Sequence, residues 1–289
     1  MPATTSKICL SSDGTPIYAE ASGNPANPSV VFAHGFALSG IVFDKLFSDP
    51  RMLEKLYLVR YDVRGHGRSG KPNSAEGYAS SLYAADFAAV AADFSLHMPV
   101  FVGWSAGAQI ISDICSHISP VPLIGAIALG GPLCVATAVK TLKPKLLELL
   151  RKFVSPDAAT ALETRVEFIN ACFADPENVP FADKAAWIGY TVLQGPNVPA
   201  AIMAGHKPDQ TELVALGAQG FPAMILYGTE DQLQDGAVGA VEARPYFTDL
   251  EVAAIEGGSH SVFYDSLDET VGYILAFCLR VNGQGRPTS

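Results

Sequence analysis

The stretch VGWSAGA, residues 102–108, is the part of this sequence that decides its fold. It places Ser105 between Gly103 and Gly107, directly after the apolar run PVFV. The residues that follow, 105–118, repeat isoleucine at helical spacing and predict a helix. A serine on a sharp strand-to-helix turn, with a glycine on each side to relieve crowding, is typical of an exposed nucleophile. Because the chain holds 26 glycines, the G-x-S-x-G pattern alone is a weak signal, and its surroundings have to decide.

Short β-rich runs alternate with longer segments of helical period along most of the chain. The run that precedes Ser105 carries no charged residue on either face, which favours a central strand. Repeated strand, helix, strand predicts an α/β fold with a mostly parallel sheet between layers of helices. The predicted strands are 17–21, 30–33, 56–61, 100–102, 123–129, 223–227 and 250–255.

The interval between the fifth and sixth of these strands is far longer than a crossover connection requires. We therefore expect a core domain formed by residues 1–136 and 209–289, and a helical cap at 137–208. The alternative is that the extra helices pack on the sheet edge and have no role in binding. The helices predicted there are 144–154, 155–173 with Ser155 as N-cap, 181–194, and a last one that opens at Asp209 with Glu212 three residues later.

A serine hydroxyl is a poor nucleophile unless a general base, and a group that orients this base, lie beside it. Asp231 follows the sixth predicted strand in GTED, and His260 follows the last in EGGSH. Parallel strands bring the loops at their carboxyl ends to one edge of a sheet, so we expect Ser105, Asp231 and His260 to meet there. Glu230 and Asp235 stay open as alternatives to Asp231. A structural turn serine and a surface histidine are the corresponding alternatives for the other two residues.

Along nearly its whole length the chain resembles the α/β-hydrolase superfamily. The resemblance rests on HGF at 34–36, YDVRGHGRS at 61–69, GWSAG, YGTED and GGSH. It implies an α/β-hydrolase fold, with a mostly parallel central sheet of about eight strands flanked by helices and an inserted helical cap. The site residues that it implies are Ser105 as nucleophile, His260 as base, Asp231 as its carboxylate partner, and the backbone N–H groups of Phe36 and Ala106 as the oxyanion hole.

Composition narrows the partners of this chain. Its formal net charge is −10 at pH 7 and its basic residues do not cluster, so we expect neither nucleic acid nor a membrane as partner. Residues 118–139 carry no charge and are long enough to span a bilayer. Their prolines and glycines argue against a continuous helix, and we expect a buried strand with a loop on each side instead.

The first ten residues contain no apolar core of a signal peptide, so we expect a cytoplasmic protein, either a monomer or a homodimer. The five cysteines are scattered without C-x-x-C spacing, which predicts neither a disulfide framework nor a zinc site. The histidines and carboxylates do not cluster either, and we expect no metal and no cofactor.

A serine nucleophile makes an acyl-enzyme the natural intermediate, so the expected reaction is hydrolysis of a carboxylic ester or lactone of a small substrate. Dehalogenases and epoxide hydrolases of this superfamily use an aspartate nucleophile, which position 105 does not supply. Apolar side chains in segment 137–208 favour an apolar substrate. The alternatives are a C–C bond-cleaving or acyl-transfer enzyme with the same triad, and a ligand receptor on this fold. The candidate substrate-binding residues are His34, Trp104, Phe168, Trp187 and Tyr190.

Overall fold

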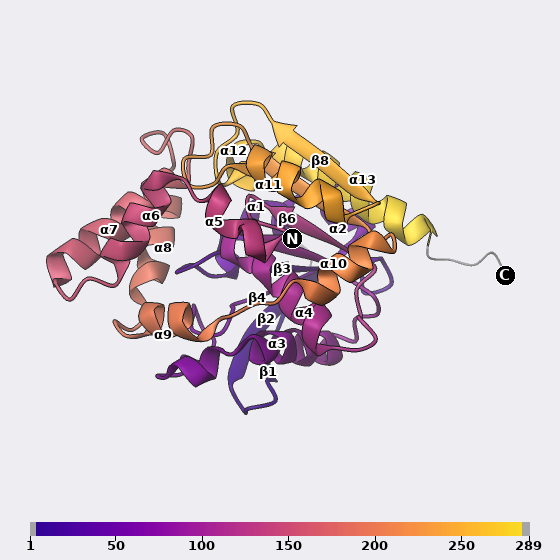
Figure 1. The fold of residues 1–289 in the computed structure, drawn as a ribbon, viewed down its shortest axis with the longest axis horizontal. Coiled ribbons are helices and arrows are strands. Elements are labelled where there is room, and N and C mark those ends of the chain that lie inside the picture. The colour runs from indigo at the N-terminus through magenta and orange to yellow at the C-terminus, as the bar shows by residue number, and fades with distance from the viewer. Residues whose placement is uncertain (1–3, 285–289) are drawn as a thin grey trace.

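The computed structural model describes residues 4–284, and at its centre lies one sheet of eight strands (Figure 1). The strand order is β1-β2-β4-β3-β5-β6-β7-β8. The β1–β2 hairpin is antiparallel, as is β2 to β4, and all other neighbours are parallel. The mostly parallel eight-stranded sheet is therefore confirmed. The strands are β1 Thr5–Leu10, β2 Pro16–Gly23, β3 Ser29–Ala33, β4 Tyr57–Tyr61, β5 Val100–Trp104, β6 Gly125–Leu129, β7 Ala223–Gly228 and β8 Leu250–Ile255.

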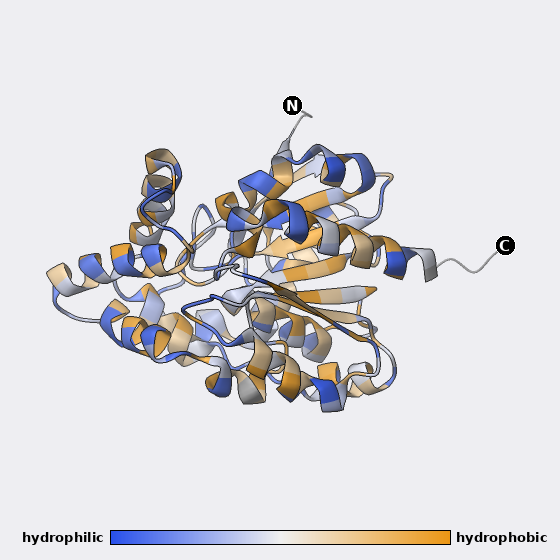
Figure 2. Cartoon of the chain, turned by 90° about the horizontal axis from the view of Figure 1, so that it is seen from above, coloured by the Kyte–Doolittle hydropathy of each residue, from blue (hydrophilic) through white to orange (hydrophobic). Residues whose placement is uncertain are grey.

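Helices cover both faces of this sheet, and Figure 2 shows hydrophilic blue mainly on the helices around largely apolar strands. The α-helices outside segment 137–208 are α1 Asp44–Ser48, α2 Pro50–Lys55, α3 Ser80–Asp93, α4 Ile110–His117, α10 Thr211–Ala218, α11 Gly236–Ala243, α12 Val262–Asp265 and α13 Leu267–Gln284. The 3-10 helices are η1 Gly40–Phe43, η2 Ala75–Tyr78, η3 Ser105–Gln109, η4 Val135–Thr137 and η5 Arg244–Tyr246.

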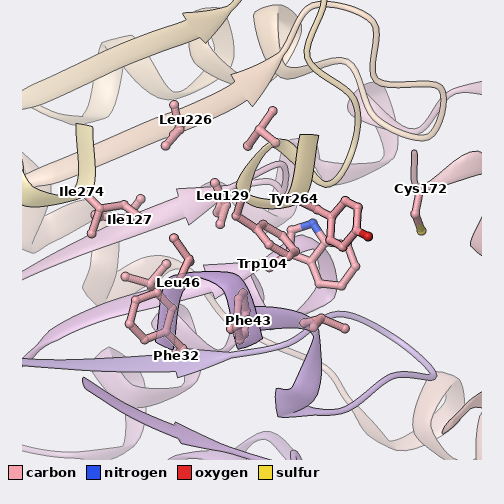
Figure 3. Packing of buried hydrophobic residues seen from close by; sticks show 14 of the residues in the cluster. Phe32, Phe43, Leu46, Trp104, Ile127, Leu129, Cys172, Leu226, Tyr264 and Ile274 are labelled. Carbon is pink, nitrogen blue, oxygen red and sulfur yellow. The ribbon is translucent and has the colours of Figure 1, made fainter. Parts of the chain in front are cut away.

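Successive side chains of a strand point to opposite faces, and here each face has its own apolar layer. Phe32 of β3 packs in one layer with Phe43 and with Ile274 of α13 (Figure 3). Its neighbour Val31 belongs to the other layer, together with Phe87 of α3. The sheet is thus buried on both sides, which explains why its strands read as continuous apolar runs.

β6 occupies the middle of the uncharged segment 118–139, and all five of its residues are buried. The segment is therefore a buried strand with flanking loops, as expected. Within residues 4–284, no helix has both the length and the hydropathy that a bilayer-spanning helix needs.

Five α-helices lie between β6 and α10, and Figure 1 shows α6, α7, α8 and α9 together at one end of the molecule. The prediction of a helix capped by Ser155 is wrong in its start. The N-cap is Asp157, whose carboxylate accepts a hydrogen bond from the Thr160 backbone N–H at 2.8 Å, because an aspartate side chain reaches that donor well. The bounds are α5 Ala138–Thr141, α6 Pro144–Phe153, α7 Ala158–Ala171, α8 Phe181–Val192 and α9 Val198–Gly205.

The sequence did not predict α9, because Gly195, Pro196 and Pro199 are turn signals. Pro199 lies in the first turn, where its missing N–H costs no helical hydrogen bond. Asp209 also differs from its prediction as a helix opener. Its carboxylate accepts a hydrogen bond from the Thr211 backbone N–H at 2.9 Å, and α10 starts at Thr211 itself.

Candidate active site

Ser105 follows β5 directly and opens η3, which leads into α4. Its φ of +54° lies in the left-handed region, which costs a residue with a side chain roughly 1–2 kcal/mol. The flanking glycines make this turn possible. A Cβ on Gly103 would lie 2.4 Å from the carbonyl oxygen of Gly107, and a Cβ on Gly107 would lie 2.5 Å from that of Ala33. The G-x-S-x-G stretch is therefore a strained turn that only these glycines allow.

Asp231 and His260 lie in the loops that follow β7 and β8, and the structure brings them into contact. His260 Nδ1 is 2.8 Å from Asp231 Oδ2, and both side chains are buried. The second oxygen, Oδ1, accepts hydrogen bonds from the backbone N–H groups of Leu233 and Gln234 at 2.7 and 2.9 Å. Because a carboxylate only accepts, Nδ1 carries the hydrogen, and the neutral ring presents Nε2 as an acceptor.

The two other carboxylates that the sequence left open point elsewhere. Asp235 is the N-cap of α11, and its Oδ1 accepts a hydrogen bond from the Val238 backbone N–H at 3.0 Å. Glu230 is exposed. Of the three, only Asp231 bonds to His260.

Ser105 and His260 approach each other around Gly130 and Gly131, which follow β6. A Cβ on Gly131 would lie 2.4 Å from the carbonyl oxygen of Ser105, and one on Gly130 would lie 3.6 Å from His260 Nδ1. Among residues 4–284, nothing forms a hydrogen bond with the Ser105 hydroxyl. The structure thus pairs the imidazole with the carboxylate and places the serine nearby without a hydroxyl–imidazole bond.

Trp104 connects the serine turn to the loop of His260. Its indole Nε1 donates a hydrogen bond to the carbonyl oxygen of His260 at 2.9 Å, and the two rings lie 5.2 Å apart. The side chain is buried and packs against Phe263 and Trp187, with ring centroids 5.1 and 5.9 Å away. Figure 3 shows it inside the apolar cluster of buried side chains. Trp104 therefore holds the backbone of His260 by a hydrogen bond and packs near its imidazole ring.

The loop of His260 is also bound to α7, through the residue that ends this helix. The carbonyl oxygen of Cys172, the C-cap of α7, accepts hydrogen bonds from the Ser261 backbone N–H at 3.0 Å and from Ser259 Oγ at 2.9 Å. The residues on both sides of His260 are thus held by a single carbonyl group of segment 137–208.

Two backbone N–H groups are available beside Ser105. The Phe36 amide lies in the loop after β3, and none of the residues described accepts a hydrogen bond from it. The Ala106 amide lies in the first turn of η3, where N–H groups lack an intrahelical acceptor. A Cβ on Gly35 would lie 3.0 Å from Ser105 Cβ, so a glycine there lets the loop approach closely. Phe36, Ala106 and Ser105 line the same cavity.

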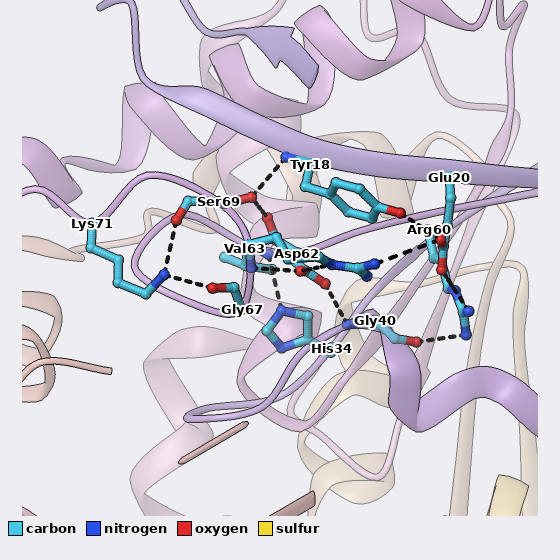
Figure 4. Close-up of polar contacts among 11 residues, drawn as sticks. Tyr18, Glu20, His34, Gly40, Arg60, Asp62, Val63, Gly67, Ser69 and Lys71 are labelled. Atoms are coloured by element: carbon cyan, nitrogen blue, oxygen red, sulfur yellow. Dashed lines mark hydrogen bonds and ion pairs between the residues drawn. The ribbon is translucent and has the colours of Figure 1, made fainter. Parts of the chain in front are cut away.

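A buried polar network holds the loop that carries Phe36 (Figure 4). His34 Nε2 accepts a hydrogen bond from the Val63 backbone N–H at 2.9 Å, and burial lowers the pKa of His34. Asp62 Oδ1 accepts from the Gly40 backbone N–H at 2.8 Å, and Oδ2 accepts from Arg68 Nε at 3.0 Å. Burial raises the pKa of Asp62, but the hydrogen bonds from Arg68 outweigh it, and the net pKa lies below the ordinary value. A neutral imidazole and an ionised carboxylate thus fix the loop.

His66 lies against this network, with its ring centroid 5.2 Å from that of His34. Its Nε2 is buried and has no hydrogen-bond partner among the residues described. Burial lowers the pKa of His66 to about 3. The imidazole is therefore neutral in the folded protein at ordinary pH.

A cavity of about 520 Å³ opens beside Ser105. Most of its wall is apolar and comes from the helices of segment 137–208. Gln109, His206 and Gln234 are among the few polar side chains that border it. The larger apolar side chains of the wall are Phe36, Leu142, Leu146, Leu150, Phe168, Ile202 and Met203.

Of the five candidate substrate-binding residues, the structure places Phe168 in this wall and the other four outside it. Trp104 and Trp187 do not reach the cavity because they pack against each other in the core. His34 is buried under the loop of Phe36, with both ring nitrogens bonded to the backbone. Tyr190 is half-buried on α8, away from the wall.

Gln109 and His206 are cavity residues that sequence analysis missed. Gln109 lies four residues after Ser105, and this spacing places both on one side of a helix, so the signal was present. His206 follows α9, which was not predicted, and no pattern in the sequence marks it. In the part of the chain that the structure describes, no three His, Cys, Asp or Glu side chains are grouped so that they could hold a metal ion.

Comparison with known proteins identifies the family. A model of the alpha/beta hydrolase family matches residues 30–272, so the chain belongs to that family. The probable oxidoreductase EphD of Mycobacterium tuberculosis is 40% identical over 104 residues, which are 35% of this chain and 17% of that protein. The chain thus spans less than a fifth of that relative. The non-heme chloroperoxidase of Streptomyces lividans is 26% identical over 260 residues, which are 87% of this chain and 91% of that protein.

Solved structures give matches over nearly the full length. The esterase RhEst1 from Rhodococcus sp. ECU1013 has a TM-score of 0.83 and 25% identity, and the match covers 94% of this chain and 98% of that one. A candidate aryl esterase from Burkholderia cenocepacia has a TM-score of 0.86 and 22% identity, with 96% and 100% covered. The α/β-hydrolase fold is therefore confirmed, and relatives named as esterases support a hydrolase function.

Proposed function

We propose that this chain is a serine hydrolase that cleaves a carboxylic ester or lactone of a small, mainly apolar substrate through an acyl-enzyme intermediate. The observation that carries the proposal is the left-handed conformation of Ser105, whose side chain borders the 520 Å³ cavity. A strained serine of this kind is exposed for attack on a substrate. The bond between His260 and Asp231 in the neighbouring loops supports the proposal.

In the first half-reaction, Ser105 Oγ attacks the carbonyl carbon of the substrate while His260 Nε2 takes its proton. This step requires the serine side chain to turn toward Nε2 when the substrate binds, since hydrogen bonds of this kind often form only in the substrate complex. Asp231 Oδ2 keeps Nδ1 protonated and stabilises the imidazolium. The N–H groups of Phe36 and Ala106 donate hydrogen bonds to the carbonyl oxygen as it becomes negative. Each such donor lowers the activation free energy by about 3 kcal/mol.

In the second half-reaction, the acyl-enzyme is hydrolysed. His260 has given its proton to the departing alcohol and is again able to accept one. A water molecule attacks the acyl carbonyl while Nε2 takes its proton. The bond between the acyl carbon and Ser105 Oγ then breaks, Nε2 returns the proton to Oγ, and the carboxylic acid leaves.

We further propose that segment 137–208 acts as a cap over a core formed by 1–136 and 209–289. Side chains of α5, α6, α7 and α9 supply most of the apolar cavity wall, which supports a role in substrate binding over mere packing at the sheet edge. An apolar acyl or alcohol group would be removed from water there, with roughly 25 cal/mol gained per Å² of buried apolar surface.

The test is labelling with a fluorophosphonate probe together with turnover of p-nitrophenyl esters of increasing acyl length. We expect labelling at Ser105, and loss of both labelling and turnover in Ser105→Ala. Ser116→Ala is the matched control, because Ser116 lies on α4 and donates a hydrogen bond to the carbonyl oxygen of Asp209. Labelling without ester turnover would indicate a C–C bond-cleaving or acyl-transfer enzyme. Absence of both in the unmodified protein would indicate a ligand receptor.

A further inference from the structure

A second histidine–aspartate pair borders the cavity of Ser105, separate from the pair formed by His260. His206 Nε2 lies 2.7 Å from Asp113 Oδ2. Asp113 is on α4, in the core, and its side chain is fully buried, whereas His206 follows α9 and is 11% exposed. The pair therefore joins the end of segment 137–208 to α4, the α-helix that follows Ser105 in the sequence.

Contacts with neighbouring residues fix the orientation of the His206 ring. Tyr83 lies against it, with ring centroids 4.2 Å apart and an angle of 30° between the planes. The backbone N–H of His206 donates a hydrogen bond to the carbonyl oxygen of Ile202 at 2.9 Å, which holds His206 at the end of α9. The ring therefore presents one edge to Asp113 and the opposite edge away from it.

The hydrogen-bonding capacity of the free edge follows from the partner. A carboxylate oxygen only accepts, so Nε2 carries the hydrogen of this bond, and the neutral ring leaves Nδ1 as an acceptor. Nδ1 forms no hydrogen bond with a residue in 4–284, and it is not sealed from solvent. His206 borders the 520 Å³ cavity together with Ser105 and Gln109. His206, whose Nδ1 is an unused acceptor, is thus one of the few polar residues that border a mainly apolar cavity.

We propose that His206 determines substrate specificity by accepting a hydrogen bond from a hydroxyl or N–H group of the substrate. The inference rests on the proposed function only in that the ligand is an ester or lactone bound at Ser105. The apolar wall would take the hydrocarbon part, and His206 would select compounds that carry a donor. A ligand that covers Nδ1 with an apolar group removes it from water without replacing the bond, which disfavours that ligand.

A purely structural role is the competing explanation, because the pair also ties α9 to α4. Such a role predicts that loss of His206 lowers stability and weakens every ligand by the same factor. A specificity role predicts a change in the ratio between ligands that differ in one group. The ratio is therefore the quantity to measure.

The probes are eight methyl 3-phenylpropanoates, each with one ring substituent at either the meta or the para position: hydroxyl, methoxy, methyl or carboxylate. Hydroxyl donates, methoxy only accepts, methyl does neither, and carboxylate is anionic. Their dissociation constants are measured by calorimetry on Ser105→Ala, which separates binding from turnover. We expect the hydroxyl compound, at one of the two positions, to bind about tenfold more tightly than the methyl and methoxy compounds.

Two further changes are then made in this background. His206→Phe keeps an aromatic ring and removes the acceptor, so the three neutral compounds should bind within about twofold of one another. Asp113→Asn allows the side-chain amide to donate to Nε2, which moves the ring hydrogen to Nδ1, so the methoxy compound should approach the hydroxyl compound in affinity. Ser116→Ala, which lies on the same helix as Asp113 and outside the cavity wall, should leave the ratio as it is.

A hydroxyl preference that survives in His206→Phe, or that is absent in Ser105→Ala alone, would overturn the inference, as would tightest binding of the carboxylate compound. If His206→Phe does not fold, the methoxy-to-hydroxyl ratio in Asp113→Asn decides. Turnover of the methyl-substituted ester by the unmodified protein tests the proposed function separately. Lack of turnover with an intact hydroxyl preference would refute the hydrolase proposal alone.

Discussion

Replacing Asp231 with asparagine should abolish most turnover, and the surrounding hydrogen bonds determine how. Oδ1 accepts from the backbone N–H groups of Leu233 and Gln234, so the amide oxygen of the asparagine has to take that position. Its NH₂ group then replaces Oδ2, 2.8 Å from His260 Nδ1, and donates to it. This moves the imidazole hydrogen to Nε2. The ring can no longer accept the proton of the Ser105 hydroxyl.

The expected size of the effect is a loss of about 10⁴-fold in kcat, the loss that the wrong imidazole tautomer causes in a serine triad. This corresponds to about 5.5 kcal/mol of transition-state stabilisation. The free energy of unfolding should change by only about 1 kcal/mol, because the substitution keeps the shape of the side chain and all of its hydrogen-bonded neighbours.

The assay is p-nitrophenyl ester hydrolysis under saturating substrate, with urea unfolding as the measure of stability. Asp235→Asn is the control, because Asp235 caps α11 and asparagine is an equally good N-cap. Both kcat and the equilibrium constant for unfolding should therefore stay within about twofold of the values for the unmodified protein. Turnover of Asp231→Asn within tenfold of the unmodified protein, or a larger loss in Asp235→Asn, would refute the reasoning.

Gly107→Ala should lower the free energy of unfolding by about 2–3 kcal/mol in urea, because its Cβ would lie 2.5 Å from the rigid carbonyl oxygen of Ala33. The control Gly189→Ala, with no atom within 4 Å and a helical position, should raise it by up to about 1 kcal/mol, and equal effects would contradict the steric argument. His66 should make the protein acid-sensitive: the folded state keeps its pKa at about 3, the unfolded chain has the ordinary value of 6.5, and the unfolded state thus binds more protons between these limits. Stability is therefore full above pH 6.5 and falls with pH toward 3, by about 1.4 kcal/mol per pH unit from this group. His66→Gln should remove that slope in urea unfolding at pH 6 and 4.5, and an unchanged slope would show that another group is responsible.

The sheet could be predicted from the sequence because its central strands are buried on both faces. β5 and β6 are fully buried, and such strands appear as short apolar runs between turn signals. Helix starts were harder to predict, since Ser155 and Asp157 are both good N-cap residues and only the contact with Thr160 selects the second. α9 was missed because Pro196 before it and Pro199 in its first turn resemble a break.

For the candidate site, too, one part could be predicted from the sequence and another part could not. The sequence predicts that the loops carrying Ser105, Asp231 and His260 lie close together, because the loops that follow parallel strands lie at one edge of a sheet. The cavity wall could not, since Phe168 and Trp187 are both aromatic residues on helices of the same segment. Hydropathy does not tell whether an apolar side chain faces a cavity or the core, and only packing sends Trp187 to the core. The pairing of His206 with Asp113 depends on a contact across 93 positions, which no local pattern reports.

The carbonyl oxygen of Cys172 accepts hydrogen bonds from the residues on both sides of His260. The end of helix α7 and the loop of His260 are therefore fixed relative to each other. A chimera that receives segment 137–208 from a relative would therefore keep the imidazole aligned only if its α7 ends with a carbonyl oxygen in the same position. Substitutions within the apolar wall leave this contact in place, whereas changes that shift the end of α7 would move the loop of His260 with it.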